Sequence, residues 1–363
     1  MRGPKPPTID LTDTERQASG RDRLRGYEAW HTSGHSGRVE LADDLFDALY
    51  TPLAGHELQQ ADDGNRRKLN EWRETMFHSR PITEIIQQRY SCRTYLDKPI
   101  AEDKRQQLAD FLSSLKCGPL GASARFALVA ATEQDRNSLR GLGTYGFIKG
   151  ATGFIVGAVQ PAEKNLEDYG YLMERAILFA TDIGLGTCWL GGTFTQSSFA
   201  KKISATRNEK MPAVTSIGYI AGPDHSNDWI RQRAGSDHRL PWESLFFHKR
   251  FGETLAHDKA GAFAVPLEMV RLGPSASNKQ PWRIVKDGNA WHFYLRRTQR
   301  YGRGSLTFSL LRLADLQRVD MGIAMSHFEL TAHELGLKGK WTVKEPDIEK
   351  PDKQTEYSAS WIH

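Results

Sequence analysis

Two arginines and a serine alternate in the segment that follows a short apolar pattern near residue 85. Arg89, Ser91 and Arg93 are each separated by one residue and carry two guanidinium groups and one hydroxyl. Guanidinium groups bind phosphate through paired, charge-assisted hydrogen bonds, and a hydroxyl can bind the same ligand or a neighbouring polyol chain. The triplet is a candidate anion site at a helix exit, with a solvated basic edge as the alternative.

A loop rich in hydrogen-bonding side chains runs from Pro274 to Trp282, ahead of an apolar strand. Its donors and acceptors are Ser275, Ser277, Asn278 and Gln280. A plain turn needs fewer such groups. We therefore interpret this segment, called the serine loop below, as a candidate for binding the polar edge of a ring-shaped ligand.

Two adjacent glycines, Gly191 and Gly192, follow another apolar segment. Backbone without side chains can approach a planar ligand closely and donate an N–H to it, and an ordinary glycine turn is the alternative. Cys188 lies just before them, with neither His nor Asp beside it in the sequence. We interpret Cys188 as a small buried residue and not as a nucleophile.

The elements that would position these residues occur twice in the chain. The segment Asp168–Trp189 aligns without gaps on Asp320–Trp341, an offset of 320 − 168 = 152 residues. In both copies apolar residues recur at helical spacing up to a glycine, which predicts a buried helix that ends in left-handed conformation at Gly184 and at Gly336. Two unrelated helices would also have to explain the shared Gly-Leu-x-x-x-Trp exit, so an internal repeat is the better interpretation.

Shorter similarities surround the repeated helix and imply two α+β halves. Helices are expected at Leu108–Leu115 and Val265–Leu272. A Gly-Pro pair then opens a loop in each half, at Gly118 and at Gly273. Strands are expected at Phe126–Ala130, Phe154–Val159, Val214–Ala221, Trp282–Val285 and Tyr357–Ile362. The expected organisation is an N-terminal extension of unknown role (1–80), a first half (81–248) and a second half (249–363).

Composition restricts the class of protein. The 49 basic and 44 acidic residues give a net charge of +5 but are mixed along the chain, which favours a solvated surface over a nucleic-acid face. Three cysteines without CxxC spacing predict neither a zinc site nor a disulfide framework, which suits the cytoplasm. No apolar run is long enough for a membrane span or a signal peptide. One basic run is either a solvated hairpin end or a docking patch for the phosphates of NADPH: Arg296, Arg297, Arg300 and Arg303.

With these motifs together, the sequence resembles the nitroreductase family of FMN enzymes, in its internally repeated form. The matching stretches begin at Ile85, Gly184, Gly218, Arg239 and Pro274, and they span roughly residues 80–363. The resemblance implies an α+β fold, a nitroreductase-like α/β/α sandwich. Its two tandem half-repeats would form a pseudo-dimer within one chain.

The resemblance also implies which residues bind FMN. Arg89 and Arg239 would hold the phosphate, and Arg93 would lie nearer the ring or ribityl chain. A backbone N–H at the glycine pair would donate to flavin N5. The full set is Arg89, Ser91, Arg93, Gly191, Gly192 and Arg239 from the first half, and Pro274, Ser275, Ser277 and Asn278 from the second. No catalytic acid or base is evident, and flavin chemistry does not demand one.

Each half also carries the opposite half's motif in incomplete form. Arg250 is not followed by the second Arg and the Ser of the triplet, and the segment after Pro119 lacks the Asn of the serine loop. One complete FMN site is therefore expected per chain, and a monomer suffices for it.

The activity that the resemblance implies is hydride transfer from NAD(P)H through flavin N5 to a small electron acceptor such as a nitroaromatic or a quinone. No nucleic acid or membrane partner is expected. The same fold supports other flavin reactions, such as dehalogenation and desaturation. A flavin-binding or nucleic-acid-binding protein without turnover is the alternative from a different class.

Overall fold

The computed structural model describes residues 78–135, 137–144, 146–192, 194–222, 235, 238–299 and 314–363. Nearly all of the expected N-terminal extension lies outside these ranges, as do Arg300 and Arg303 of the basic run. The described part has a mixed α+β fold with two sheets. No helix within these ranges is both long and apolar enough to cross a membrane.

The first sheet is antiparallel throughout, with strand order β1-β2-β4-β3. Its strands are β1 (Ala124–Ala130), β2 (Gly153–Val159), β3 (Gly186–Leu190) and β4 (Val214–Gly218). Every residue of β2 is buried, because alternate side chains point into different clusters. Ile155 packs in the main core, whereas Phe154 packs in a second cluster on the opposite face. The first sheet is therefore covered on both faces.

The second sheet has strand order β5-β6-β7-β9-β8. Its strands are β5 (Phe246–His248), β6 (Trp282–Asp287), β7 (Ala290–Arg296), β8 (Lys340–Thr342) and β9 (Thr355–Ile362). The edge strand β5 pairs in parallel with β6, and the other neighbours are antiparallel. β5 precedes the expected boundary at residue 248, so the chain has already joined the second sheet before that boundary.

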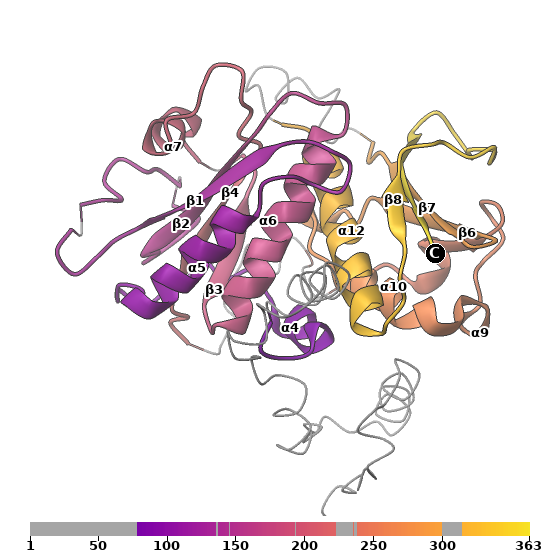
Figure 1. The fold of residues 1–363 in the computed structure, drawn as a ribbon, viewed down its shortest axis with the longest axis horizontal. Coiled ribbons are helices and arrows are strands. Elements are labelled where there is room, and N and C mark those ends of the chain that lie inside the picture. Colours follow the sequence, from indigo (N-terminus) through magenta and orange to yellow (C-terminus); the bar gives the residue numbers. More distant parts are fainter. Residues whose placement is uncertain are drawn as a thin grey trace, which may run out of the picture.

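Helices fill the space beside and between the sheets (Figure 1). They are α4 (Ile82–Gln88), α5 (Glu102–Ser114), α6 (Asn165–Asp182), α7 (Gln196–Lys202), α9 (His257–Ala260), α10 (Ala264–Leu272) and α12 (Leu316–Glu334). The two long helices, α6 and α12, lie side by side at the centre of the molecule. They contain the helical parts of the two aligned segments that the sequence analysis interpreted as a repeat, and 16 of the 18 residues of α6 and 13 of the 19 residues of α12 are buried.

The crossing of α6 and α12 depends on two glycines at positions that the sequence alignment matches. A Cβ on Gly170 would collide with the carbonyl oxygen of Val319, and a Cβ on Gly322 would collide with that of Glu167. Both pairs are related by the repeat offset, since 322 − 170 = 152 and 319 − 167 = 152. The absence of side chains at these two places lets the helix backbones touch.

Most of the predicted elements are confirmed. Gly184 and Gly336 end their helices with φ angles of +79° and +73°, in the left-handed region that the sequence pattern predicted. The strand predicted to reach Ala221 ends at Gly218 instead. Beyond it an isolated antiparallel bridge pairs Ile220 with Tyr95, which lies in the segment after α4.

Candidate functional site

The short helix α4 places Arg89 against the centre of the molecule. Ile82, Ile85 and Ile86 recur at helical spacing, and all three are buried in a cluster with Leu178 of α6 and Met269 of α10. Arg89 follows as the C-terminal cap in extended conformation, with its N–H bonded to the carbonyl of Ile85 at 2.9 Å. Its side chain is only 6% exposed, which is unusual for arginine.

Arg89 faces a fully buried carboxylate, Glu174 of α6. Arg89 Nε lies 3.7 Å from Glu174 Oε1, and the same oxygen lies 3.0 Å from Nε2 of His327 on α12. The other carboxylate oxygen accepts the indole N–H of Trp189 at 2.8 Å. His327 Nδ1 lies 2.8 Å from the carbonyl oxygen of Met269. Glu174 therefore joins α4, α6, β3, α12 and, through His327, α10.

The rest of the arginine triplet lies in extended backbone beside β3. Ser91 forms a parallel bridge with Thr187, and Arg93 Nη1 donates to the carbonyl of Ser91 at 3.4 Å. Because alternate residues of an extended segment share a face, this backbone directs the triplet to one side of the chain. Arg93 and Ser91 make direct contact with each other, and Arg89 reaches the neighbouring elements through Glu174.

The serine loop has unusual backbone geometry. Ser277, Asn278 and Gln280 have φ angles of 50°, 52° and 47°, in the left-handed region that residues with side chains rarely adopt. The loop begins at Pro274 after the last turn of α10, and Ser275 Oγ accepts the N–H of Gln280 at 2.8 Å. Strained backbone of this kind persists only where surrounding contacts hold it, and it concentrates at functional sites.

Arg239 and its neighbours from the first half hold the serine loop in place. Asn278 Nδ2 donates to the carbonyls of Gly235 and His238 at 2.6 and 2.9 Å. Arg239 donates to the Leu272 carbonyl at 3.0 Å and lies 3.4 Å from Asn278 Oδ1. The backbone N–H of Leu240 donates to Gln280 Oε1 at 2.8 Å. The structure thus brings the Arg239 segment and the serine loop into direct contact.

Asp320 of α12 is hydrogen-bonded to the backbone of the serine loop. Its Oδ1 accepts the N–H of Ala276 at 2.9 Å, while Oδ2 is buried with no hydrogen-bond partner among the described residues. Burial raises the pKa of this carboxyl well above its usual range, since the one hydrogen bond that stabilises the carboxylate is too little to offset desolvation. A buried polar atom without a partner calls for an explanation, and a bound water, ion or ligand group would supply one.

The glycine pair lies at the first turn of α12. A Cβ on Gly191 would lie 2.5 Å from the side chain of Leu316, so packing against this helix already accounts for a glycine there. Gly192 is exposed. Leu316 is one turn from Asp320, so the glycine pair and the serine loop flank the same end of α12. The role expected of the glycine backbone toward a flavin stays a prediction.

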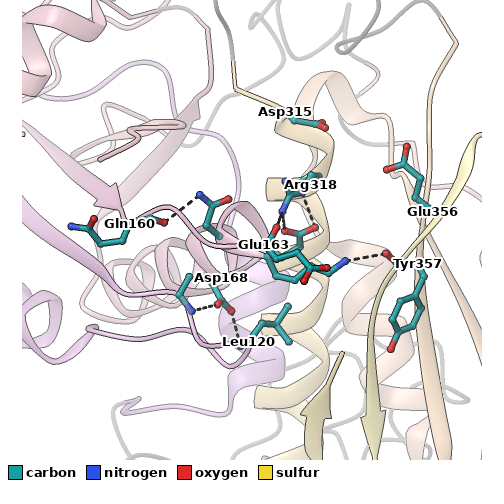
Figure 2. Close-up of polar contacts among 12 residues, drawn as sticks. Leu120, Gln160, Glu163, Asp168, Asp315, Arg318, Glu356 and Tyr357 are labelled. Atoms are coloured by element: carbon teal, nitrogen blue, oxygen red, sulfur yellow. Dashed lines mark hydrogen bonds and ion pairs between the residues drawn. The ribbon is translucent and has the colours of Figure 1, made fainter. Parts of the chain in front are cut away.

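The N-terminal end of α6, around Lys164 and Asp168, corresponds to the end of α12 that carries Asp320. It is arranged differently, and we call it the mirror region. Asp168, which aligns with Asp320 in the sequence, accepts two backbone N–H groups, from Leu120 at 2.8 Å and Ala122 at 2.7 Å (Figure 2). Desolvation by burial nevertheless raises its pKa to about 6. Both oxygens of Asp168 are thus used within the protein, in contrast to Asp320.

Side chains fill much of the mirror region. Lys164 donates to the carbonyl of Tyr357 at 3.2 Å, and Arg318 binds both oxygens of Glu167 (Figure 2). A polar cavity of about 200 Å³ remains among these residues. Arg297 of the basic run is bound to Asp315 and Glu356, both at 2.7 Å, whereas Arg296 is half exposed. Among the described arginines of that run, only Arg296 presents its side chain substantially to solvent.

Three residues of the site were not predicted from the sequence: Glu174, His327 and Asp320. The repeated Asp in the aligned helices was a signal for Asp320. Glu174 aligns with Ser326 and His327 with Arg175, so the repeat alignment gave no signal for that pair. Cys188 is buried, as predicted.

Comparison with known proteins gives one family. The family described as Putative TM nitroreductase matches residues 81–332. A solved structure of a putative nitroreductase from Thermotoga maritima is 20% identical with a TM-score of 0.48, and the match covers 78% of this chain and 94% of that one. A putative nitroreductase from Desulfovibrio desulfuricans in complex with FMN is 20% identical with a TM-score of 0.32, covering 39% of this chain and 88% of that one. No curated protein matches the chain.

Proposed function

The chain belongs to this nitroreductase family, and from that premise we propose that it is an FMN-dependent oxidoreductase that uses NAD(P)H to reduce a small acceptor such as a nitroaromatic or a quinone. The observation that carries the proposal is the contact between the Arg239 segment and the strained serine loop, 3.4 Å apart at Arg239 and Asn278. Cationic, amide and hydroxyl groups from two distant parts of the chain meet there. FMN presents a phosphate, a polyol chain and a polar ring edge, which need these three kinds of partner.

The residues present fit the cofactor. Arg89 and Arg239 would bind its phosphate, and Arg93 would lie near the ring or ribityl chain. Ser91 from the first half would add a hydroxyl, and the second half would supply Pro274, Ser275, Ser277 and Asn278. The buried Asp320 Oδ2, which lacks a partner among the described residues, lies under this loop and is available to a polar group of the ligand. The backbone at Gly191 and Gly192 would lie near flavin N5.

FMN, when bound, supplies the redox chemistry by accepting hydride from NAD(P)H at N5 and passing electrons to the acceptor. The protein binds and orients the cofactor, and the cationic residues stabilise negative charge near it. Contacts of the buried Arg89 and of the partly buried Asn278 keep these groups in place before the ligand arrives, which reduces the entropy lost on binding.

We further propose that the two halves form a pseudo-dimer with a single FMN site. The reciprocal contacts of Gly170 and Gly322 support this. Across a two-fold axis each contact occurs twice with the partners exchanged, as Gly170 meets Val319 and Gly322 meets Glu167. The mirror region would bind no second flavin, since Lys164 and Arg318 are engaged there and Arg250, the counterpart of Arg89, has a side chain that is 78% exposed. A monomer would then suffice for the site. Three free cysteines suit a reducing cytoplasm.

The test is an absorbance spectrum of the purified protein loaded with FMN, followed by NADH or NADPH in the absence of oxygen. The proposal predicts that a nicotinamide cofactor bleaches the bound flavin and that a quinone or nitroaromatic restores the oxidised spectrum. Failure to bind FMN would refute the proposal. Bound flavin that neither nucleotide reduces would identify a flavin-binding protein without this activity.

A further inference from the structure

The positions of two nitrogen atoms fix one proton of His327. Its Nδ1 lies 2.8 Å from the Met269 carbonyl oxygen, which can only accept, so Nδ1 carries a hydrogen. Its Nε2 lies 3.0 Å from Glu174 Oε1. Two lone pairs facing each other at this distance, with both side chains fully buried, would be strongly unfavourable. A second proton must therefore lie between Nε2 and the carboxyl.

The charge of the pair follows from that proton. If the proton is on the imidazole, the pair is a cation beside an anion; if it is on the carboxyl, both groups are neutral. The sum is zero in either case. A buried carboxylate without this proton would instead cancel the charge of Arg89, whose Nε lies 3.7 Å from the same oxygen.

We propose that Glu174 and His327 share one proton and so act as a neutral positioning pair, which does not cancel the positive charge that the Arg89 guanidinium offers to an anionic ligand group. This inference rests on the proposed function, under which the anionic group is the FMN phosphate. His327 of the second half would thereby determine the preference of a first-half arginine for phosphorylated over unphosphorylated flavin. The 3.7 Å separation exceeds hydrogen-bonding distance, so Glu174 acts on Arg89 mainly through charge.

The other half offers a matched control. Trp341, the repeat counterpart of Trp189, donates its indole N–H to Glu329 at 2.8 Å, and Tyr171 of α6 donates to the same carboxylate at 2.6 Å. Glu329 thus joins the two long helices as Glu174 does. Arg250, the counterpart of Arg89, does not take the corresponding place beside Glu329, because it pairs with Glu253 at the surface.

The experiment measures dissociation constants of FMN and riboflavin, which lacks the phosphate, by quenching of flavin fluorescence in the full-length protein. The quantity compared is the ratio of riboflavin to FMN constants. His327→Gln cannot hold the proton, so Glu174 neutralises Arg89 and the ratio falls by roughly tenfold, the scale of one charge-assisted bond. Glu174→Gln leaves Arg89 its charge beside a neutral His327. Its ratio stays within about threefold of wild type.

The double variant Glu174→Gln/His327→Gln decides between charge and structure. With no carboxylate left, it restores the wild-type ratio, whereas a purely structural role would make the double variant at least as poor as His327→Gln. Glu329→Gln leaves the ratio unchanged. The proposal is overturned if Glu174→Gln lowers the ratio as His327→Gln does, if His327→Gln lowers nothing, or if the double variant is not rescued.

Thermal melting shows whether each variant is folded. Should His327→Gln fail to fold, the ratio of Glu174→Gln alone decides, because the proposal requires it to be retained. Wild-type protein that binds neither flavin would refute the proposed function instead of this inference.

Discussion

Gly170 and Gly322 occupy equivalent places in the crossing of α6 and α12, each against the backbone of the other helix. Because backbone cannot move aside as a flexible side chain can, Gly170→Ala and Gly322→Ala should each lower the free energy of unfolding by about 1–3 kcal/mol, the usual range for overpacking. Chemical denaturation measures this. Gly222→Ala is the control, since a Cβ there meets nothing within 4 Å. Equal stability of all three variants would show that the crossing is not close-packed.

The two long helices could be predicted from the sequence because apolar periodicity, a terminal glycine and a following tryptophan are local signals. The position of β5 could not, because three residues carry no signal of which sheet they join. The Glu174–His327 pair was also unpredictable. Its members are 153 residues apart and meet only through the crossing of the two helices. At Gly191 a Cβ would meet the side chain of Leu316, so helix packing accounts for the glycine, and the approach of a ligand that the sequence suggested stays a prediction.

A pH dependence of stability is expected from Asp168. Burial raises the pKa of its carboxyl from 3.8 to about 6, so its stabilising contribution is full below about pH 4 and is lost as the pH rises through 6. Relative to an Asp168→Asn variant, the wild type should lose roughly 2–3 kcal/mol of unfolding free energy between pH 4 and pH 7. Urea denaturation of both proteins at each pH measures the difference. A difference that does not change with pH would contradict the shifted pKa.

Asn278 should contribute to FMN affinity through both its backbone conformation and its side-chain amide. Asn278→Ala removes bonds to Gly235 and His238 and puts Ala at a φ of 52°, a conformation that costs Ala about 1–2 kcal/mol. FMN affinity should fall at least roughly tenfold. Asn278→Gly should recover the backbone part alone. Ser204→Ala, with a similar φ of 49° away from the site, should leave affinity unchanged. Flavin fluorescence measures all three, and equal affinities for wild type and Asn278→Ala would show that the serine loop does not bind FMN.

Arg89 and Arg250 form a second matched pair. Arg89→Ala should weaken FMN binding by roughly 10- to 150-fold, because one charge-assisted bond to phosphate contributes about 1.5–3 kcal/mol. Arg250→Ala should have little effect, since that side chain is exposed and pairs with Glu253. Dissociation constants from flavin fluorescence compare them. Equal losses would indicate two working sites, and a loss for Arg250 alone would mean that the halves are assigned backwards.

The central claim is that two unequal halves build one FMN site in each chain. Titration of apoprotein with FMN, in monomer isolated by size-exclusion chromatography, tests it most directly. The mirror region differs from the site in that Asp168 already binds two backbone N–H groups where Asp320 binds one. The account predicts saturation at one FMN per monomeric chain. Saturation at two, or binding that appears only in an oligomer, would contradict it.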